Sequence, residues 1–170
     1  MSLTALATVK QFLRISHTSE DTALQVIIDA AEAWIAKQAN IHLCADAATA
    51  YESKTEDLDG GGLYLWPTYL PIRTITSIAD RMDDDAAVDA TEYFVSELLT
   101  RIERWSDDYS DGKITEWDDG RKRYRVVYTA GYLASDIPDS FTRAVLHYVY
   151  RDYHGRDSDN AGLWSPELDK

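Results

Sequence analysis

The sequence is poor in cysteine and in basic residues, and it has no long apolar run. Its single cysteine, Cys44, excludes an intramolecular disulfide and is typical of a reducing cytosol. No apolar run approaches the roughly 20 residues that cross a bilayer, and the N-terminal residues lack the charged and apolar regions of an export signal. We therefore expect a soluble protein without a membrane span.

Basic residues are outnumbered by acidic ones, 17 to 30, and the net charge is -13. The imbalance is concentrated in residues 80–119, which hold 14 acidic and 4 basic side chains. Such a surface repels phosphate, so counterion release cannot drive ordinary DNA binding. Two interpretations stay open: a solvated surface that keeps the protein soluble, or a wall past which DNA slides without sticking.

Apolar residues recur every three or four positions near both ends of the chain. This period predicts helices over 5–14, 19–40 and 138–153. Thr4 is placed to cap the first helix, and Pro138 stands in the first turn of the last one. Because the apolar stripes of these helices cannot be buried by each helix alone, we expect the two ends of the chain to pack together.

The middle of the chain, about 57–130, is rich in turn residues, β-branched residues and aromatics. We expect strands within 63–66, 72–78 and 122–129. Residues 93–105 suit a helix by spacing and a strand by composition, and we favour a strand. The predicted fold class is therefore α+β: mainly a helical bundle, three to four helices from both chain ends, with a small inserted antiparallel β-sheet.

Three segments contain residues that occur in ion or phosphate sites. His42-Leu43-Cys44 offers two soft ligands, but zinc needs three or four, so a partly buried helix end is the favoured interpretation. Asp57-Leu58-Asp59-Gly60 resembles the start of a calcium loop, yet Thr68 stands where the closing glutamate belongs. Gly60-Gly61-Gly62 lacks the Lys-Ser or Lys-Thr of a phosphate loop. We predict no catalytic residue, cofactor or metal, and no enzyme activity.

Two segments carry a family resemblance when they are considered together. Val9-Lys10-Gln11-Phe12-Leu13-Arg14-Ile15 with the helix that follows, and Tyr128-Thr129-Ala130-Gly131-Tyr132 with Ile137-Pro138, resemble the head-to-tail connector (neck adaptor) family of tailed bacteriophages and prophages. Leu70-Pro71-Ile72 resembles the family's proline-led strand. The positions that carry the motif are Val9, Leu13, Ile15, Leu24, Ala30, Ala31, Tyr128, Ala130, Gly131, Tyr132, Ile137, Pro138 and Tyr153.

The resemblance implies a structural protein of the virion neck, assembled in the bacterial host cytoplasm. The resemblance covers about residues 5–156, so we expect a single connector-like domain over 1–156; the polar tail over 157–170 lies outside the family pattern. The resemblance also implies a ring, twelvefold like the portal, that binds copies of itself, the portal above and the next neck or tail-completion protein below. DNA passes through such a ring without specific binding.

Specific surfaces can be assigned on this basis. The candidate DNA-channel acids are Asp83, Asp84, Asp85, Asp107 and Asp108. Leu163 and Trp164 lie in a tail too short to form a core, so we expect them to dock on a neighbouring subunit or partner. Most other aromatic residues can equally fill the core. Two alternatives remain: a small enzyme that uses the acidic middle section, and an acidic DNA mimic that binds a basic partner.

Overall fold

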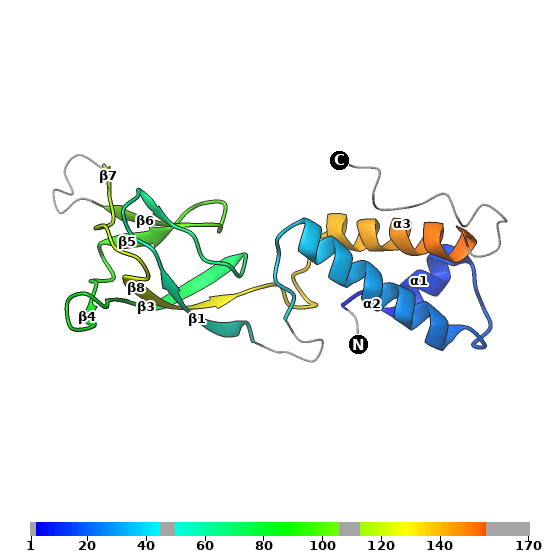
Figure 1. Cartoon of the computed structure of the whole chain (residues 1–170). Coiled ribbons are helices and arrows are strands. Elements are labelled where there is room, and N and C mark those ends of the chain that lie inside the picture. Colours follow the sequence, from blue (N-terminus) through cyan, green and yellow to red (C-terminus); the bar gives the residue numbers. More distant parts are fainter. Residues whose placement is uncertain (1–2, 45–49, 106–112, 156–170) are drawn as a thin grey trace. The chain divides into compact units, whose positions relative to one another are not determined.

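The structure is a computed structural model that describes residues 3–44, 50–105 and 113–155 (Figure 1). The chain divides into two compact units, which are considered separately. The helical unit is built from Met1–Ala39 and Ala134–Lys170, and the sheet unit from Asn40–Leu133. Among the described residues, no helix combines the length and the apolar character that a membrane span needs.

The helical unit contains α1 (Leu6–Leu13), α2 (Asp21–Gln38) and α3 (Asp139–Gly155), which lie against one another (Figure 1). Their apolar stripes face inward, as their periodicity predicts. The buried apolar side chains are Val9, Leu24, Ile27, Ile28, Ala31, Ala36, Phe141, Val145 and Val149. Helices from both ends of the sequence therefore share one core.

Aromatic contacts join α3 to the two N-terminal helices. Trp34 of α2 packs on Tyr148 with ring centroids 5.6 Å apart, and Phe12 of α1 meets the ring of His147 edge-on at 5.9 Å. Such tilted and T-shaped pairs add to the apolar burial.

The start of the first helix differs from the prediction that Thr4 caps it. The N-cap is Ala5, and it makes no side-chain hydrogen bond. Glu32 of α2, only 6% exposed, accepts hydrogen bonds from the backbone N–H groups of Leu3 (3.1 Å) and Thr4 (2.6 Å). A buried carboxylate from α2 thus fixes the backbone just before α1, but these two N–H groups precede the helix and are not the donors that a cap satisfies.

The sheet unit contains two antiparallel sheets. One has the order β1-β8-β3-β4; in the other, β6 pairs with β2, β5 and β7. Within the described residues the strands are β1 (Glu52–Leu58), β2 (Tyr64–Leu65), β3 (Ile72–Asp80), β4 (Ala86–Ala87), β5 (Tyr93–Val95), β6 (Ile102–Trp105), β7 (Ile114–Thr115) and β8 (Tyr124–Ala130). The expected strands within 63–66, 72–78 and 122–129 are present as β2, β3 and β8.

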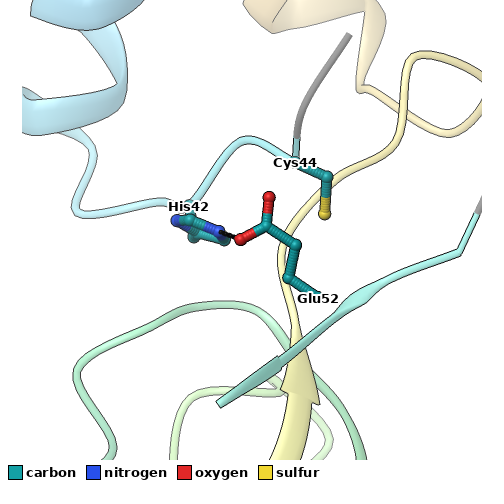
Figure 2. A group of neighbouring side chains, drawn as sticks. All are labelled: His42, Cys44 and Glu52. Carbon is teal, nitrogen blue, oxygen red and sulfur yellow. Dashed lines mark hydrogen bonds and ion pairs between the residues drawn. The ribbon is translucent and has the colours of Figure 1, made fainter. Parts of the chain in front are cut away.

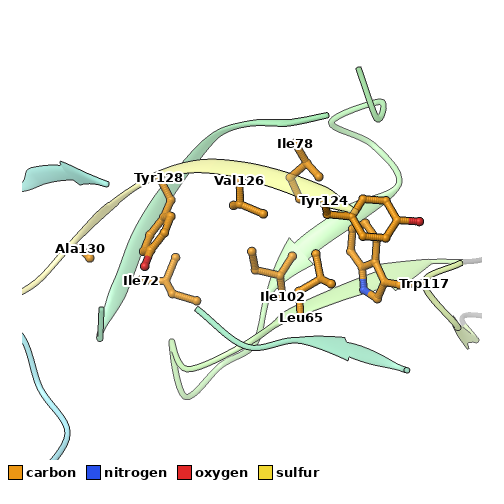
Figure 3. Packing of buried hydrophobic residues seen from close by; sticks show 9 residues of the cluster. All are labelled: Leu65, Ile72, Ile78, Ile102, Trp117, Tyr124, Val126, Tyr128 and Ala130. Atoms are coloured by element: carbon orange, nitrogen blue, oxygen red, sulfur yellow. The ribbon is translucent and has the colours of Figure 1, made fainter. Parts of the chain in front are cut away.

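The core of the sheet unit lies between the two sheets (Figure 3). β8 is the central contributor, because alternate residues along it are buried, as a strand with one covered face requires. The cluster consists of Leu65, Ile72, Ile78, Ile102, Trp117, Tyr124, Val126, Tyr128 and Ala130. β2 and β6 supply Leu65 and Ile102 from the second sheet, so the two sheets bury each other.

The prediction of a mainly helical bundle is wrong, although the α+β class is right. Helices and strands are present in similar amounts, and the β part forms two packed sheets instead of one small insertion. The main cause is β1, whose sequence Glu52–Leu58 contains one apolar residue and was not expected to be a strand. It pairs along its whole length with β8, so backbone hydrogen bonding rather than side-chain pattern defines it.

Candidate functional site

Three side chains that could bind a metal ion gather in the sheet unit. His42 and Cys44 lie in the segment that precedes β1, and Glu52 is the first residue of β1. Figure 2 shows the Glu52 carboxylate between the His42 ring and the Cys44 thiol. His42 Nε2 lies 2.9 Å from Glu52 Oε2, and the three potential ligand atoms all lie within 4.8 Å of one another. We call this group the His42–Cys44–Glu52 cluster.

Backbone hydrogen bonds fix the segment that carries His42 and Cys44. The N–H of His42 donates to the carbonyl of Leu70 (2.6 Å), and the N–H of Cys44 donates to that of Tyr132 (3.0 Å). The N–H of Tyr132 in turn donates to the His42 carbonyl (3.0 Å), which makes a short parallel bridge. The Cys44 thiol donates to the carbonyl of Ala130 at 3.4 Å. Both side chains are therefore held by ordered backbone.

Gly131 allows this close packing. Its φ is +102°, in the region that favours glycine. A Cβ there would lie 2.9 Å from Cys44 Sγ and 2.9 Å from His42 Cδ2, which is closer than side chains tolerate. The glycine of the Tyr128–Tyr132 motif thus has a local packing role beside the cluster.

The other motif positions are divided between the two units. Most are at least half-buried: Val9, Leu13, Ile15, Leu24 and Ala31 at the N-terminal end, Tyr128, Ala130 and Tyr132 in or after β8, and Ile137, Pro138 and Tyr153 near α3. Ala30 is exposed. These residues therefore mark the folded framework, and their role in a neck assembly remains a prediction.

The candidate DNA-channel acids can be located only in part. Asp83, Asp84 and Asp85 are exposed in the turn that joins β3 to β4. Asp107 and Asp108 lie outside the described residues, as do Leu163 and Trp164 of the proposed tail contact.

Asp80 and Arg123 form the strongest charge pair near that turn. Arg123 donates to both carboxylate oxygens of Asp80, with Nη2–Oδ2 at 2.6 Å and Nε–Oδ1 at 3.0 Å. This hydrogen bonding holds the pKa of Asp80 below its ordinary value and raises that of Arg123. A carboxylate with a lowered pKa is a poor general base, so Asp80 gives no support to an enzyme in the acidic section.

We expect Asp80→Asn to lower the melting temperature by several degrees at pH 7, because it removes the closer of two carboxylates that pair with Arg123, and Asp80 is only 9% exposed. The depressed pKa makes the contribution of Asp80 complete above the ordinary carboxyl pKa of about 3.9, and it is lost as the pH falls below that value. When thermal unfolding is measured from pH 7 to pH 3, the difference in melting temperature between Asp80→Asn and the wild type should become smaller.

Asp84→Asn is the matched control, because it removes the same charge from an exposed residue whose φ of 50° asparagine tolerates. It should melt close to the wild type. A gap for Asp80→Asn that stays constant down to pH 3 would contradict the role of the ionised carboxylate.

An aromatic and arginine group lies at β2, with Trp66 exposed and Tyr64 and Arg101 half-buried. Trp66 is 59% exposed and meets Tyr64 edge-on at 5.8 Å, while the guanidinium of Arg101 lies 4.2 Å from the Tyr64 ring centroid. Glu103 accepts a hydrogen bond from Arg101 at 2.8 Å and orients it. We call Tyr64, Trp66 and Arg101 the Trp66 patch. The sequence does not predict that these three residues meet, because their contact depends on the pairing of β2 with β6.

One family model matches the N-terminal part of the chain, from α1 through β1. Residues 4–61 match the family model of phage gp6-like head-tail connector proteins. No protein of curated function matches the sequence.

Solved structures of phage-like particles share the fold. A chain in the neck of an empty gene transfer agent particle, computed with C6 symmetry, matches with a TM-score of 0.56 and 21% identity, over 95% of this chain and 82% of that one. A chain in the virion of the native particle matches with a TM-score of 0.57 and 19% identity, over 94% and 81%. A third chain, from the neck of the native particle computed with C12 symmetry, matches with a TM-score of 0.52 and 19% identity. The match covers 91% of this chain and 81% of that one.

These likenesses confirm the resemblance to head-to-tail connectors that the sequence predicted. They support a structural connector or adaptor role in a phage-like neck. The matched family is one of structural proteins and is not a class of enzymes.

Proposed function

We propose that this protein is a ring-forming adaptor in the neck of a tailed phage, a prophage or a related particle, and that it links the DNA-filled head to the tail. The observation that carries the proposal is the match of residues 4–61 to head-tail connectors. The shared fold with neck chains of gene transfer agent particles supports it from an independent direction. In this role the protein acts through its surfaces and performs no catalysis.

The proposed ring has twelve subunits and docks beneath the portal, with the next neck or tail-completion protein on its other face. A twelvefold arrangement is favoured because one of the similar chains comes from a neck computed with C12 symmetry. A ring of this kind needs a head-to-tail contact between copies, and such a contact closes only if the rotation between subunits is fixed. The portal can supply that rotation, so isolated subunits are expected to remain monomeric.

The acidic turn is proposed to face the DNA path. Asp83, Asp84 and Asp85 are exposed and adjacent, and they would repel the phosphates of a passing duplex. Repulsion prevents the moving genome from sticking to the neck. DNA is therefore a passenger of the ring and not a ligand.

The Trp66 patch is proposed to contact the neighbouring copy. Protein interfaces are enriched in tryptophan, tyrosine and arginine, and their central residues carry most of the binding energy. The exposed Trp66 and the half-buried Arg101 bring these residue types together, with the guanidinium 6.0 Å from the Trp66 ring centroid. A second copy is the expected partner because every subunit in a ring must bind another.

Trp66→Ala should weaken portal-templated assembly about tenfold or more, which is the usual effect of removing a central interface tryptophan. The measurement is mass photometry of the full chain mixed with purified portal over a range of concentrations. Met82→Ala is the control, because Met82 is 67% exposed in the turn after β3 and lies outside the patch. Both variants should melt like the wild type.

Equal assembly of the two variants would remove the patch from the interface. Absence of any wild-type complex with the portal, at concentrations where the folded chain is monomeric, would contradict the adaptor function itself.

A further inference from the structure

We propose that the His42–Cys44–Glu52 cluster binds one transition-metal ion of the zinc type through His42 Nε2, Cys44 Sγ and a Glu52 carboxylate oxygen, with solvent as the fourth ligand. The inference depends only on residues of the sheet unit and is independent of the adaptor function. Imidazole nitrogen, thiolate sulfur and carboxylate oxygen are the three donor types that zinc takes from proteins.

The distances are close to those of a coordination site. Zinc bonds of roughly 2.0–2.3 Å in tetrahedral geometry place ligand atoms roughly 3.3–3.8 Å apart. Here all three atoms lie within 4.8 Å of one another, and the His42–Glu52 separation is 2.9 Å. Because 2.9 Å is shorter than this spacing, the carboxylate must move slightly away from the His42 ring to bind the ion. Glu52 has three side-chain torsions, so rotamer changes can provide this shift.

The two remaining ligands are pre-positioned. His42 and Cys44 are on either side of the bridge between Leu43 and Tyr132, and Gly131 leaves space for both side chains. A site on rigid backbone loses little conformational entropy when it binds an ion. The arrangement is thus more than a coincidence of side chains on a mobile surface.

Exposure favours an open, three-ligand site. Cys44 is 4% exposed, whereas the side chains of His42 and Glu52 are 21% and 34% exposed. The sulfur forms the inner wall, and the other two ligands border solvent, which can supply the fourth ligand. On binding, the Cys44 thiol releases its proton to solvent and gives up its hydrogen bond to the Ala130 carbonyl, while His42 coordinates as the neutral imidazole.

Lys54 competes with the ion. Its ammonium lies 2.7 Å from Glu52 Oε2, the same oxygen that His42 contacts, and 4.5 Å from the centroid of the Tyr69 ring. The positive charge of Lys54 repels a metal cation at this distance, and its hydrogen bond uses one of the carboxylate oxygens that the ion would need. The affinity should therefore be moderate in the wild type and higher when Lys54 is neutralised.

Cobalt(II) is a direct probe, because the chain has one cysteine. A cobalt–thiolate charge-transfer band in the near ultraviolet can come only from Cys44, and strong visible d–d bands report four-coordination. The full chain, without an affinity tag, is titrated with Co²⁺ and then with Zn²⁺. We expect a one-to-one complex that shows both bands, and loss of both bands as zinc displaces cobalt.

Variants assign the other ligands. Cys44→Ser should abolish the charge-transfer band, while His42→Asn and Glu52→Gln should each weaken cobalt binding about tenfold or more, in line with the loss of one ligand. Lys54→Met should tighten it. His17→Asn is the control, because His17 is an exposed histidine of the helical unit and should leave the titration unchanged.

The absence of a charge-transfer band in the wild type would overturn the proposal. So would a band that persists at the same affinity in both His42→Asn and Glu52→Gln, since that would show the thiol binding alone. The wild-type titration decides the question even if one variant fails to fold. A chain that binds cobalt but does not assemble with the portal would refute the adaptor function and leave the metal site standing.

Discussion

Replacing Trp117 by alanine is expected to destabilise the sheet unit by about 3–5 kcal/mol, the usual cost of removing a buried tryptophan. Trp117 is 1% exposed and lies between β7 and β8, where its ring meets Tyr124 edge-on at 4.9 Å. The guanidinium of Arg104 lies 5.6 Å from its ring centroid. Alanine would leave a cavity between the two sheets that their paired strands cannot close.

Trp117→Phe provides the comparison for this loss. Within the described part of the chain, Trp117 Nε1 is buried without a hydrogen-bond partner, so phenylalanine removes an unsatisfied donor while keeping an aromatic ring. Its expected cost is about 1–2 kcal/mol. Amide hydrogen exchange of β8 measures the opening free energy of the sheet unit alone. Equal protection in the wild type and Trp117→Ala would show that the ring does not support this core.

Gly60→Ala should be comparably damaging, at about 3 kcal/mol or more, because the added methyl group meets backbone. A Cβ at Gly60 would collide with the carbonyl oxygen of Asp118 and lie 2.9 Å from Cε2 of Tyr124. The N–H of Gly60 also donates to the carbonyl of Gly120 at 2.8 Å, so the two segments cannot separate without losing this bond. Relief requires backbone movement on both sides.

Gly62→Ala tests the same chemical change two residues away. Nothing lies within 4 Å of a Cβ at Gly62, so alanine there should change stability by less than about 0.5 kcal/mol. Urea unfolding of both variants, followed by circular dichroism, gives the comparison. Similar midpoints for Gly60→Ala and Gly62→Ala would contradict the tight contact between the glycine segment and residues 117–120.

The parts of the fold with a strong local pattern could be predicted from the sequence. α2 and α3 begin and end within two residues of the predicted ranges, because their apolar stripes are long and regular. Buried and half-buried residues alternate along the whole of β8, and its sequence shows this alternation directly. The sequence predicts the helical unit because the apolar stripes at the two ends of the chain can be buried only against each other.

β1 and the division of the strands into two sheets could not be predicted in this way. β1 is polar, and its strand conformation comes from seven residue pairs with β8 that are distant in sequence. β7 has two residues, which is too short for any periodicity to show. A prediction from the local sequence pattern therefore overestimates the fraction of helix in this fold.

Dependence on strand pairing that is distant in sequence also explains why the sequence did not place Glu52 in the His42–Cys44–Glu52 cluster. The sequence offers His42 and Cys44 as two soft ligands, but no motif or second pair supplies the third or fourth ligand that zinc needs. Glu52 joins them because the start of β1 pairs with Ala130, whose carbonyl accepts from the Cys44 thiol. The third ligand could be found only after the register of β1 against β8 was known.

The adaptor role is tested most directly by cryo-electron microscopy of the full chain mixed with the portal of its own particle. We expect an annulus beneath the portal, with twelve copies related by the portal axis, the helical and sheet units each fitting the density, and the Asp83–Asp85 turn lining the channel. Portal particles that carry no added density, or this chain found only outside the neck, would contradict the account.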